Sequence, residues 1–369
     1  MSNKFWKSFS IVLHVLFEEI DKQQKVFTEA CTNSDDVELV NMLIKNMEID
    51  VSAKKNHAIR SASYNGHIAV VERLLQDGRM DPSAVNNVAI RWSSRNGHIA
   101  VVDRLLQDGT GRVDPSDDNN SAIRSASYNG HIAVVERLLQ DGRVDPSVID
   151  NVAIRWASEN GHIAVVDRLL QDGRVDPTVD DNFAIRYASE NGHLAIVDRL
   201  LQDRRVDPSA DDNFAIRYAS HNGHIAVVDR LLQDRRVDPS ADDNFAIRYA
   251  SENGHLAVVD RLLQDRRVDP SAGNNDTIRY ASHNGHIAVV DRLLQDRRVD
   301  PSAYNNCSIR WASNNGHLAV VDRLLQDSRV DPSANNNEAI RLASEKGHIA
   351  VVDRLKQEDK SRVKLDTQT

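Results

Sequence analysis

Apolar residues recur along this chain in two short helical patterns. In FAIRYASEN, residues 183–191, Ile185, Ala188 and Ser189 lie at i, i+3 and i+4, which is one stripe of a helix. In HLAIVDRLLQD, residues 193–203, one helical face carries Leu194, Val197, Leu200 and Leu201, with Asp198 and Gln202 outside it. The patterns predict a pair of helices of about ten residues each.

The residues between the patterns predict the helix ends. Asp181 or Asn182 precedes the first pattern and is the expected N-cap. Gly192 ends the first helix, because glycine tolerates positive φ. Asp207-Pro208 closes the unit, because proline cannot continue a helix and disfavours helix at the residue before it. All nine prolines occupy this one position of the repeat.

The same unit recurs at a fixed period, marked by a Gly-His pair. The gaps between successive histidines of this pair are equal, as from His162 to His193, except for one longer gap where Thr110-Gly111 is inserted. The histidines are His67, His98, His131, His162, His193, His224, His255, His286, His317 and His348. A degenerate earlier copy places Asp36 in the same column. Helices this short need packed neighbours, so the period predicts an all-α solenoid.

Composition narrows the class of protein. The net charge is −9, so no overall basic field favours nucleic acid or anionic lipid. The two cysteines, Cys31 and Cys307, lie far apart, which suits a reducing compartment. The N-terminal apolar run is interrupted by His14, ends at Glu18, and is too short to span a bilayer. We therefore expect an intracellular, cytoplasmic protein without a membrane partner.

The repeat resembles the ankyrin family. FAIRYASENGH, residues 183–193, aligns with the family motif T-P-L-H-x-A-A-x-x-G-H, and VVDRLL, residues 227–232, aligns with V-V-x-L-L. The resemblance covers about eleven helix-turn-helix units, residues 27–359, and is greatest to long arrays of giant viruses and protists. It implies an ankyrin-repeat solenoid. The unit is shorter than the family's usual repeat of about 33 residues, which predicts short loops in place of full β-hairpin fingers. A tetratricopeptide array fits poorly, because its period is about 34 residues.

The ends of the array are expected to be capped. Residues 1–26 are predicted to form an amphipathic helix that covers the first repeat, with an apolar stripe of Trp6, Phe9, Leu13, Leu16 and Ile20. The alternative is a helix that docks a second partner. In the last repeat Lys356 replaces a leucine, and residues 360–369 form a polar tail.

Two sets of residues invite a chemical interpretation. Histidines on stacked helices about 8–10 Å apart cannot share a zinc ion that needs ligands at about 2 Å, so we expect them to hydrogen-bond backbone between adjacent turns. Ser189, His193 and Asp198 have the side chains of a hydrolase triad, but a repeated surface offers no shielded site. We therefore expect no enzyme activity, cofactor, metal or small-molecule substrate.

Arginines form three columns, represented by Arg186, Arg199 and the doublet Arg204-Arg205. The unit from residue 211 to residue 241 carries five Asp and four Arg, so its charges largely cancel. We expect salt-bridge ladders between repeats, with arginines such as Arg186 paired to aspartates of adjacent loops. Binding of nucleic acid through these arginines is the alternative.

Three columns are candidates for partner contact. The resemblance implies that helix one and the loops line a concave face that usually holds the partner. The candidate residues are Phe183, Phe214 and Phe245; Glu159, Glu190, His221, Glu252 and His283; and Tyr187, Tyr218, Tyr249 and Tyr280. We expect the phenylalanines to be the more exposed, because their column is polar in other repeats. Inter-repeat packing and ligand contact both remain open for the tyrosine column.

These observations predict a non-enzymatic scaffold that binds a protein partner of unknown identity as a monomer. An adaptor that uses the N-terminal helix as a second docking site is the first alternative. Binding of nucleic acid is a more remote one.

Overall fold

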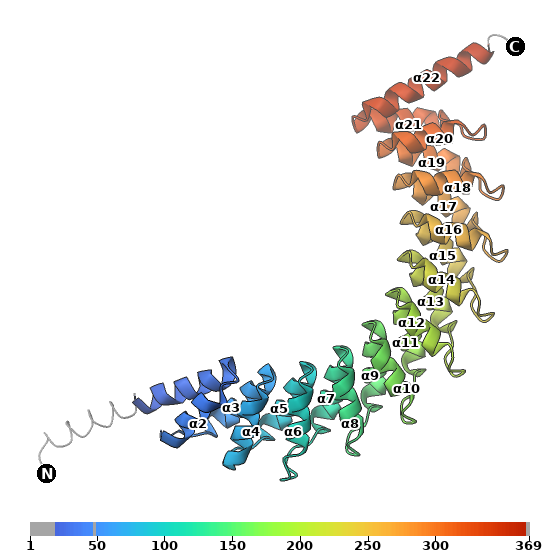
Figure 1. Ribbon diagram of the computed structural model, residues 1–369. Coiled ribbons are helices and arrows are strands. Elements are labelled where there is room, and N and C mark those ends of the chain that lie inside the picture. Colours follow the sequence, from blue (N-terminus) through green and yellow to red (C-terminus); the bar gives the residue numbers. More distant parts are fainter. Residues whose placement is uncertain (1–18, 47–48, 367–369) are drawn as a thin grey trace, which may run out of the picture. The chain divides into compact units, whose positions relative to one another are not determined.

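The computed structural model describes residues 19–46 and 49–366, and every regular element within those residues is a helix (Figure 1). The predicted stripe at Trp6, Phe9, Leu13 and Leu16 lies outside the described residues. The chain divides into two compact units, residues 1–179 and residues 180–369. Each unit is a stack of helix pairs, which we call helix one and helix two of a repeat.

In the first unit a helix over residues 19–33 takes the place of helix one in the first repeat. The later helices one are α3 (Ala53–Asn65), α5 (Ala84–Arg95), α7 (Asp117–Tyr128) and α9 (Val148–Glu159). The helices two are α2 (Val37–Asn46), α4 (Ile68–Asp77), α6 (Ile99–Leu106), α8 (Ile132–Leu139) and α10 (Ile163–Leu170).

In the second unit the helices one are α11 (Val179–Glu190), α13 (Ala210–His221), α15 (Ala241–Glu252), α17 (Ala272–His283), α19 (Ala303–Asn314) and α21 (Ala334–Glu345). The helices two are α12 (Leu194–Leu200), α14 (Ile225–Leu231), α16 (Leu256–Leu263), α18 (Ile287–Leu294), α20 (Leu318–Leu325) and α22 (Ile349–Asp366). Helix one packs on the next helix one, as α13 does on α15, and helix two packs on the next helix two, as α14 does on α16.

The core follows the predicted stripes in part: in helix two Val197 and Leu200 are buried together with Ile196, whereas Leu194 and Leu201 are only half-buried. Ala215, Ile216 and Ala219 of α13 and Val227, Val228 and Leu231 of α14 are at most 1% exposed. Because neighbouring pairs cover both faces of each internal pair, one apolar core runs through each unit. The stripe predicted at Ile185, Ala188 and Ser189 is likewise fully buried.

A left-handed turn opens each helix one from α3 to α21, and the hydrophobic pattern did not predict it. In α13, Asp211, Asp212 and Asn213 have φ of 55°, 51° and 60°. L-residues avoid this region, and Asn and Asp tolerate it best, which explains why they dominate these three positions. The turn replaces the projecting finger, so the prediction of short loops is confirmed.

The predicted N-cap is wrong because Asp181 and Asn182 lie inside this turn, with φ of 50° and 58°. The Asn182 side chain does not cap its own helix. Its Oδ1 accepts the backbone N–H of Asp207, 25 residues later, at 2.8 Å. Asn213 and Asn244 make the same bond to Asp238 and Asp269, both at 2.7 Å. This asparagine column therefore fastens each repeat to the next.

The division of the chain into an N-terminal cap, a repeat array and a polar tail stays a prediction. The helix over residues 19–33 runs through position 26 and buries Phe27 and Cys31 completely. At the other end α22 continues through residue 360 as far as Asp366. Lys356 is exposed, whereas the corresponding Leu325 of the preceding repeat is only 7% exposed.

Candidate functional site

The phenylalanine and tyrosine columns form one aromatic ladder in the second unit. Phe183 and Tyr187 are one helical turn apart on α11, and their ring centroids are 4.0 Å apart in a stacked arrangement. Tyr187 then meets Phe214 of the next repeat at 5.5 Å, and Phe214 stacks on Tyr218 at 4.1 Å. The ladder continues from Tyr218 to Phe245 and Tyr249. These rings therefore pack between repeats.

The ladder keeps part of its surface in contact with solvent. Phe183, Phe214, Phe245, Tyr187, Tyr218, Tyr249 and Tyr280 are all half-buried. Each phenylalanine ring stacks on the tyrosine that follows it in the same helix, and the expectation that the phenylalanines are the more exposed stays a prediction. Contact of either column with a partner stays a prediction.

Arginines of helix one line the ladder. The guanidinium of Arg186 lies 5.0 Å from the Phe214 ring centroid, and that of Arg217 lies 5.1 Å from Phe245, which is cation–π geometry. Arg186 also pairs with Asp211 of the next left-handed turn at 2.7 Å, and Arg217 pairs with Asp242. The expected pairing of these arginines with aspartates of adjacent loops is confirmed.

The glutamate and histidine column lies beside the ladder. His221 has its ring 5.7 Å from Tyr249 and 6.2 Å from Tyr218, while His283 meets Trp311 edge-on at 5.3 Å. Glu190 and Glu252 are half-buried like the two histidines. In the second unit the structure therefore brings the three predicted columns together on one surface, which we call the helix-one face.

Glu159 belongs to the first unit, where it is half-buried at the end of α9. Among the described residues of that unit the aromatic contacts are isolated edge-on pairs, Tyr64 with Trp92 at 5.5 Å and Tyr128 with Trp156 at 5.6 Å. A continuous aromatic ladder is therefore described only for the second unit.

A small pocket opens on the helix-one face. It has a volume of about 140 Å³ and is lined by Arg248, Tyr249, Glu252 and Tyr280. Three of these four were predicted site residues. Arg248 was not among the predicted contacts, although it belongs to the arginine column of helix one.

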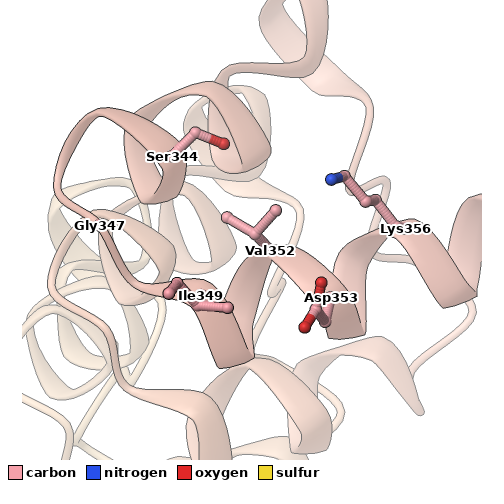
Figure 2. Close-up of a pocket in the computed structure, with 6 residues that line it drawn as sticks. All are labelled: Ser344, Gly347, Ile349, Val352, Asp353 and Lys356. Atoms are coloured by element: carbon pink, nitrogen blue, oxygen red, sulfur yellow. The ribbon is translucent and has the colours of Figure 1, made fainter.

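A second pocket, of about 290 Å³, lies at the last repeat. Figure 2 shows Ser344 and Gly347 on one side of it and Ile349 and Val352 of α22 on the other, with Asp353 and Lys356 further along α22. A Cβ on Gly347 would meet no atom within 4 Å. In earlier repeats the corresponding glycine is covered by the histidine of the next repeat, as Gly316 is by His348. The pocket is therefore part of the stacking surface at the end of the described repeats.

The Gly-His column locks repeats together. Nε2 of His98 lies 2.9 Å from the carbonyl oxygen of Tyr64, and Nε2 of His131 lies 2.9 Å from that of Arg95. A carbonyl can only accept, so Nε2 carries the hydrogen. The expected histidine bonds to backbone are confirmed, and the acceptor lies in the preceding repeat. Each of these rings also covers the glycine of the preceding repeat: a Cβ on Gly97 would lie only 2.6 Å from His131 Nδ1.

Arginines of helix two also form the predicted ladder. Arg230 pairs with Asp198 at 2.5 Å and Arg261 with Asp229 at 2.5 Å, in each case across a repeat boundary. In the doublets the second arginine is held in its loop, as Arg236 is by Asp234 at 2.7 Å. This contact keeps the pKa of the Asp234 carboxyl below its ordinary value, chiefly through the hydrogen bond from Arg236.

The residues equivalent to the hypothetical triad make no hydrogen bond to one another. In the repeat around α15 and α16, Ser251 Oγ is buried without a hydrogen-bond partner among the described residues. His255 Nε2 is bonded to the carbonyl of His221, and Asp260 is bonded to Arg292. Over the described part of the chain, no cluster of three or more metal-ligating side chains is present, and no helix could span a membrane.

Comparison with known proteins agrees with this geometry. The family profile for ankyrin repeats, which describes three copies at a time, matches overlapping segments over residues 62–150, 125–212, 154–243, 185–274 and 216–305. A search of curated proteins found no match. Members of this family are generally protein-binding modules and typically act as non-catalytic scaffolds. Because the matched segments cover more than half of the sequence, the chain belongs to the ankyrin-repeat family.

Proposed function

We propose that this chain is a non-enzymatic scaffold that binds a partner protein along the helix-one face of its second unit. The observation that carries the proposal is that some columns of the repeat have a structural role and others are left for recognition. Constant glycines, histidines and asparagines join neighbouring repeats, whereas varying residues such as Phe214, His221 and Glu252 lie half-buried on the helix-one face. Positions that vary while the framework stays constant are available for recognition.

The chemistry of the face suits a protein partner. Stacked aromatic side chains with arginines beside them are enriched among the residues that dominate binding energy at interfaces. The rings already pack on one another, so they lose little side-chain entropy when a partner covers them. The face is also continuous over Phe183, Tyr187, Phe214, Tyr218 and Phe245. An extended partner segment would fit this geometry.

Affinity capture from a cell lysate tests the proposal. The intact chain is compared with a variant in which Phe183, Phe214 and Phe245 are alanine. The control variant replaces the exposed residues Gln202, Gln233 and Gln264, at the end of helix two in the same repeats, by alanine. Helical circular dichroism first confirms that both variants are folded. A protein captured by the intact chain and the control but lost from the phenylalanine variant supports the proposal, whereas equal capture by all three contradicts it.

One observation favours nucleic acid as a second candidate. The first arginine of each doublet is exposed and has no ion-pair partner among the described residues, which applies to Arg204, Arg235, Arg266 and Arg297. These positions are one repeat apart and could each neutralise one phosphate. Four such contacts would give log K against log salt a slope of about −3 to −4. Binding that is insensitive to salt would exclude this candidate.

A further inference from the structure

The aromatic ladder is interrupted at one position. Phe214 lies between Tyr187 and Tyr218, and Phe245 lies between Tyr218 and Tyr249. The next residue of this column, between Tyr249 and Tyr280, is Asp276. The pocket lined by Tyr249 and Tyr280 occurs at this interruption.

Asp276 is buried in an arginine cluster. Its carboxylate lies 3.0 Å from Arg248 Nη2 and 2.7 Å from Arg279 Nη1, and the residue is 8% exposed. In the repeat before, the corresponding Arg217 pairs instead with Asp242 of the left-handed turn. The residue equivalent to Asp242 here is Gly273, and a Cβ at that position would collide with the Asp276 carboxylate.

Gly273 and Asp276 therefore act as a compensating pair. The carboxylate that neutralises the arginine comes from the phenylalanine column, and the glycine makes room for it. The consequence is that no phenyl ring fills the space between Tyr249 and Tyr280. We attribute the pocket to this exchange, because in the preceding repeat the Phe245 and His221 rings pack against Tyr218 and Tyr249.

The charge of the pocket is set by Glu252. Arg248 faces the pocket but is compensated by Asp276 and by Asp243, whose Oδ2 lies 3.4 Å away. The Glu252 carboxylate has no hydrogen bond or ion pair among the described residues, although its backbone carbonyl accepts bonds from Asn284 and His286. An uncompensated carboxylate beside two tyrosine rings attracts a cation, since ring faces are also attractive to positive charge.

The size of the pocket limits the ligand. Its volume of about 140 Å³ is close to that of a cavity that admits one benzene-sized group, roughly 150 Å³. Sites for drug-sized ligands are larger, about 300–1,000 Å³. The pocket therefore suits one side chain of a partner rather than a free metabolite.

We propose that Tyr249, Glu252 and Tyr280 bind a lysine or arginine side chain of the partner protein. The aliphatic part lies between the tyrosine rings and the cationic end meets the Glu252 carboxylate. This inference rests on the proposed function, because it specifies which partner chemistry the helix-one face recognises.

Short peptides test the pocket separately from any natural partner. The probe is acetyl-Gly-Ser-Lys-Ser-Gly-amide, its arginine analogue, and the uncharged norleucine and citrulline analogues. Binding to the full chain is measured by saturation-transfer NMR over millimolar probe concentrations, because a single side chain gives a dissociation constant in the millimolar range. We expect the lysine or arginine peptide to bind and the uncharged peptides not to bind.

Three variants assign the binding to the pocket. Glu252→Gln is expected to weaken binding of the cationic peptide about tenfold, because the side chain loses a charged hydrogen-bond partner. Glu345→Gln makes the same charge change in the same column, away from the pocket, and is expected to leave binding unchanged. The double change Gly273→Asp and Asp276→Phe recreates the arrangement of Asp242 and Phe245, fills the pocket, and is expected to abolish binding in a chain whose circular dichroism is intact.

The inference is overturned if no cationic peptide binds the natural chain, if the uncharged peptides bind equally, or if Glu252→Gln and the filled variant keep full affinity. Equal weakening by Glu345→Gln would show attraction to the net charge alone and would also overturn it. If the peptide binds but no protein is captured in the lysate experiment, the pocket assignment is supported and the proposed scaffold function is refuted. If a protein is captured through the helix-one face but no peptide binds, the scaffold function is supported and the pocket assignment is refuted.

Discussion

The Gly-His interlock between repeats can be measured with one pair of glycine variants. Gly97 and Gly78 both belong to the first unit and have nearly equal φ, 77° and 75°. Their surroundings differ. A Cβ at Gly97 would lie 2.6 Å from His131 Nδ1, whereas a Cβ at Gly78 would have no atom within 4 Å. Replacing each by alanine therefore separates backbone strain from the loss of the interlock.

The magnitudes follow from the structure. Gly78→Ala adds left-handed strain of about 1–2 kcal/mol, reduced by about 0.4–1 kcal/mol because the unfolded chain also loses freedom. Together these two effects lower the free energy of unfolding by about 1 kcal/mol. Gly97→Ala adds the displacement of His131, whose bond to the carbonyl of Arg95 contributes about 1 kcal/mol. That carbonyl also risks losing its partner, so we expect a total loss of about 2–4 kcal/mol for Gly97→Ala.

The assay is urea unfolding followed by circular dichroism, with amide hydrogen exchange to locate the loss, because repeat arrays do not unfold in a strictly two-state manner. Exchange in the Gly97 variant should accelerate on both sides of the boundary between α5 and α7. A His131→Ala background should remove most of the extra loss caused by Gly97→Ala, since the collision partner is gone. Equal losses for Gly97→Ala and Gly78→Ala, within the error of the unfolding measurement, would refute the interlock.

Three further changes test the packing and the charges. Ser220 Oγ is fully buried without a hydrogen-bond partner among the described residues, so Ser220→Ala should stabilise the second unit by about 1 kcal/mol in urea unfolding, and a loss would show that the hydroxyl is bonded. Ile149 is β-branched at φ 52° and 48% exposed, so Ile149→Asn should raise stability by about 1 kcal/mol, whereas Ile149→Val should not. Stability should fall on acidification in two windows. Burial lowers the pKa of His255 below 6.5, so the unfolded chain takes up that proton first as pH falls through 6.5. Arg236 lowers the pKa of Asp234 below 3.8. The stability that this ion pair contributes is therefore present above about pH 4 and is lost below it. A urea midpoint that rises between pH 7 and pH 5 would contradict the first window.

Local sequence was enough to predict the helices and their stacking. The spacing of Ile185, Ala188 and Ser189 and the position of Pro208 are properties of neighbouring residues, and helical periodicity and proline geometry act at that range. The fixed period then implied that each repeat meets an equivalent surface. The arginine ladders and the histidine bonds were also predictable, because the same side chains recur at every boundary.

Some features depend on atoms that are distant in sequence. The asparagine column was mistaken for caps, because only the stacked repeats show that Asn182 Oδ1 reaches the backbone of Asp207. Its constancy in nearly every copy was a signal for this role. The left-handed turn also escaped prediction, although the recurrence of Asn and Asp at three adjacent positions is its imprint on the sequence.

The candidate site divides in the same way. The sequence by itself determined which columns vary and which aromatic residues they carry, because a repeat can be compared with its own copies. Only the tertiary structure decided that the phenylalanines and tyrosines stack into one ladder. It also decided that Asp276 pairs with Arg248 and Arg279, beside a pocket that Glu252 helps to line. The physical reason is that a side chain's direction depends on the partner available across the repeat boundary, and Gly273 changed the partner that Arg248 could have.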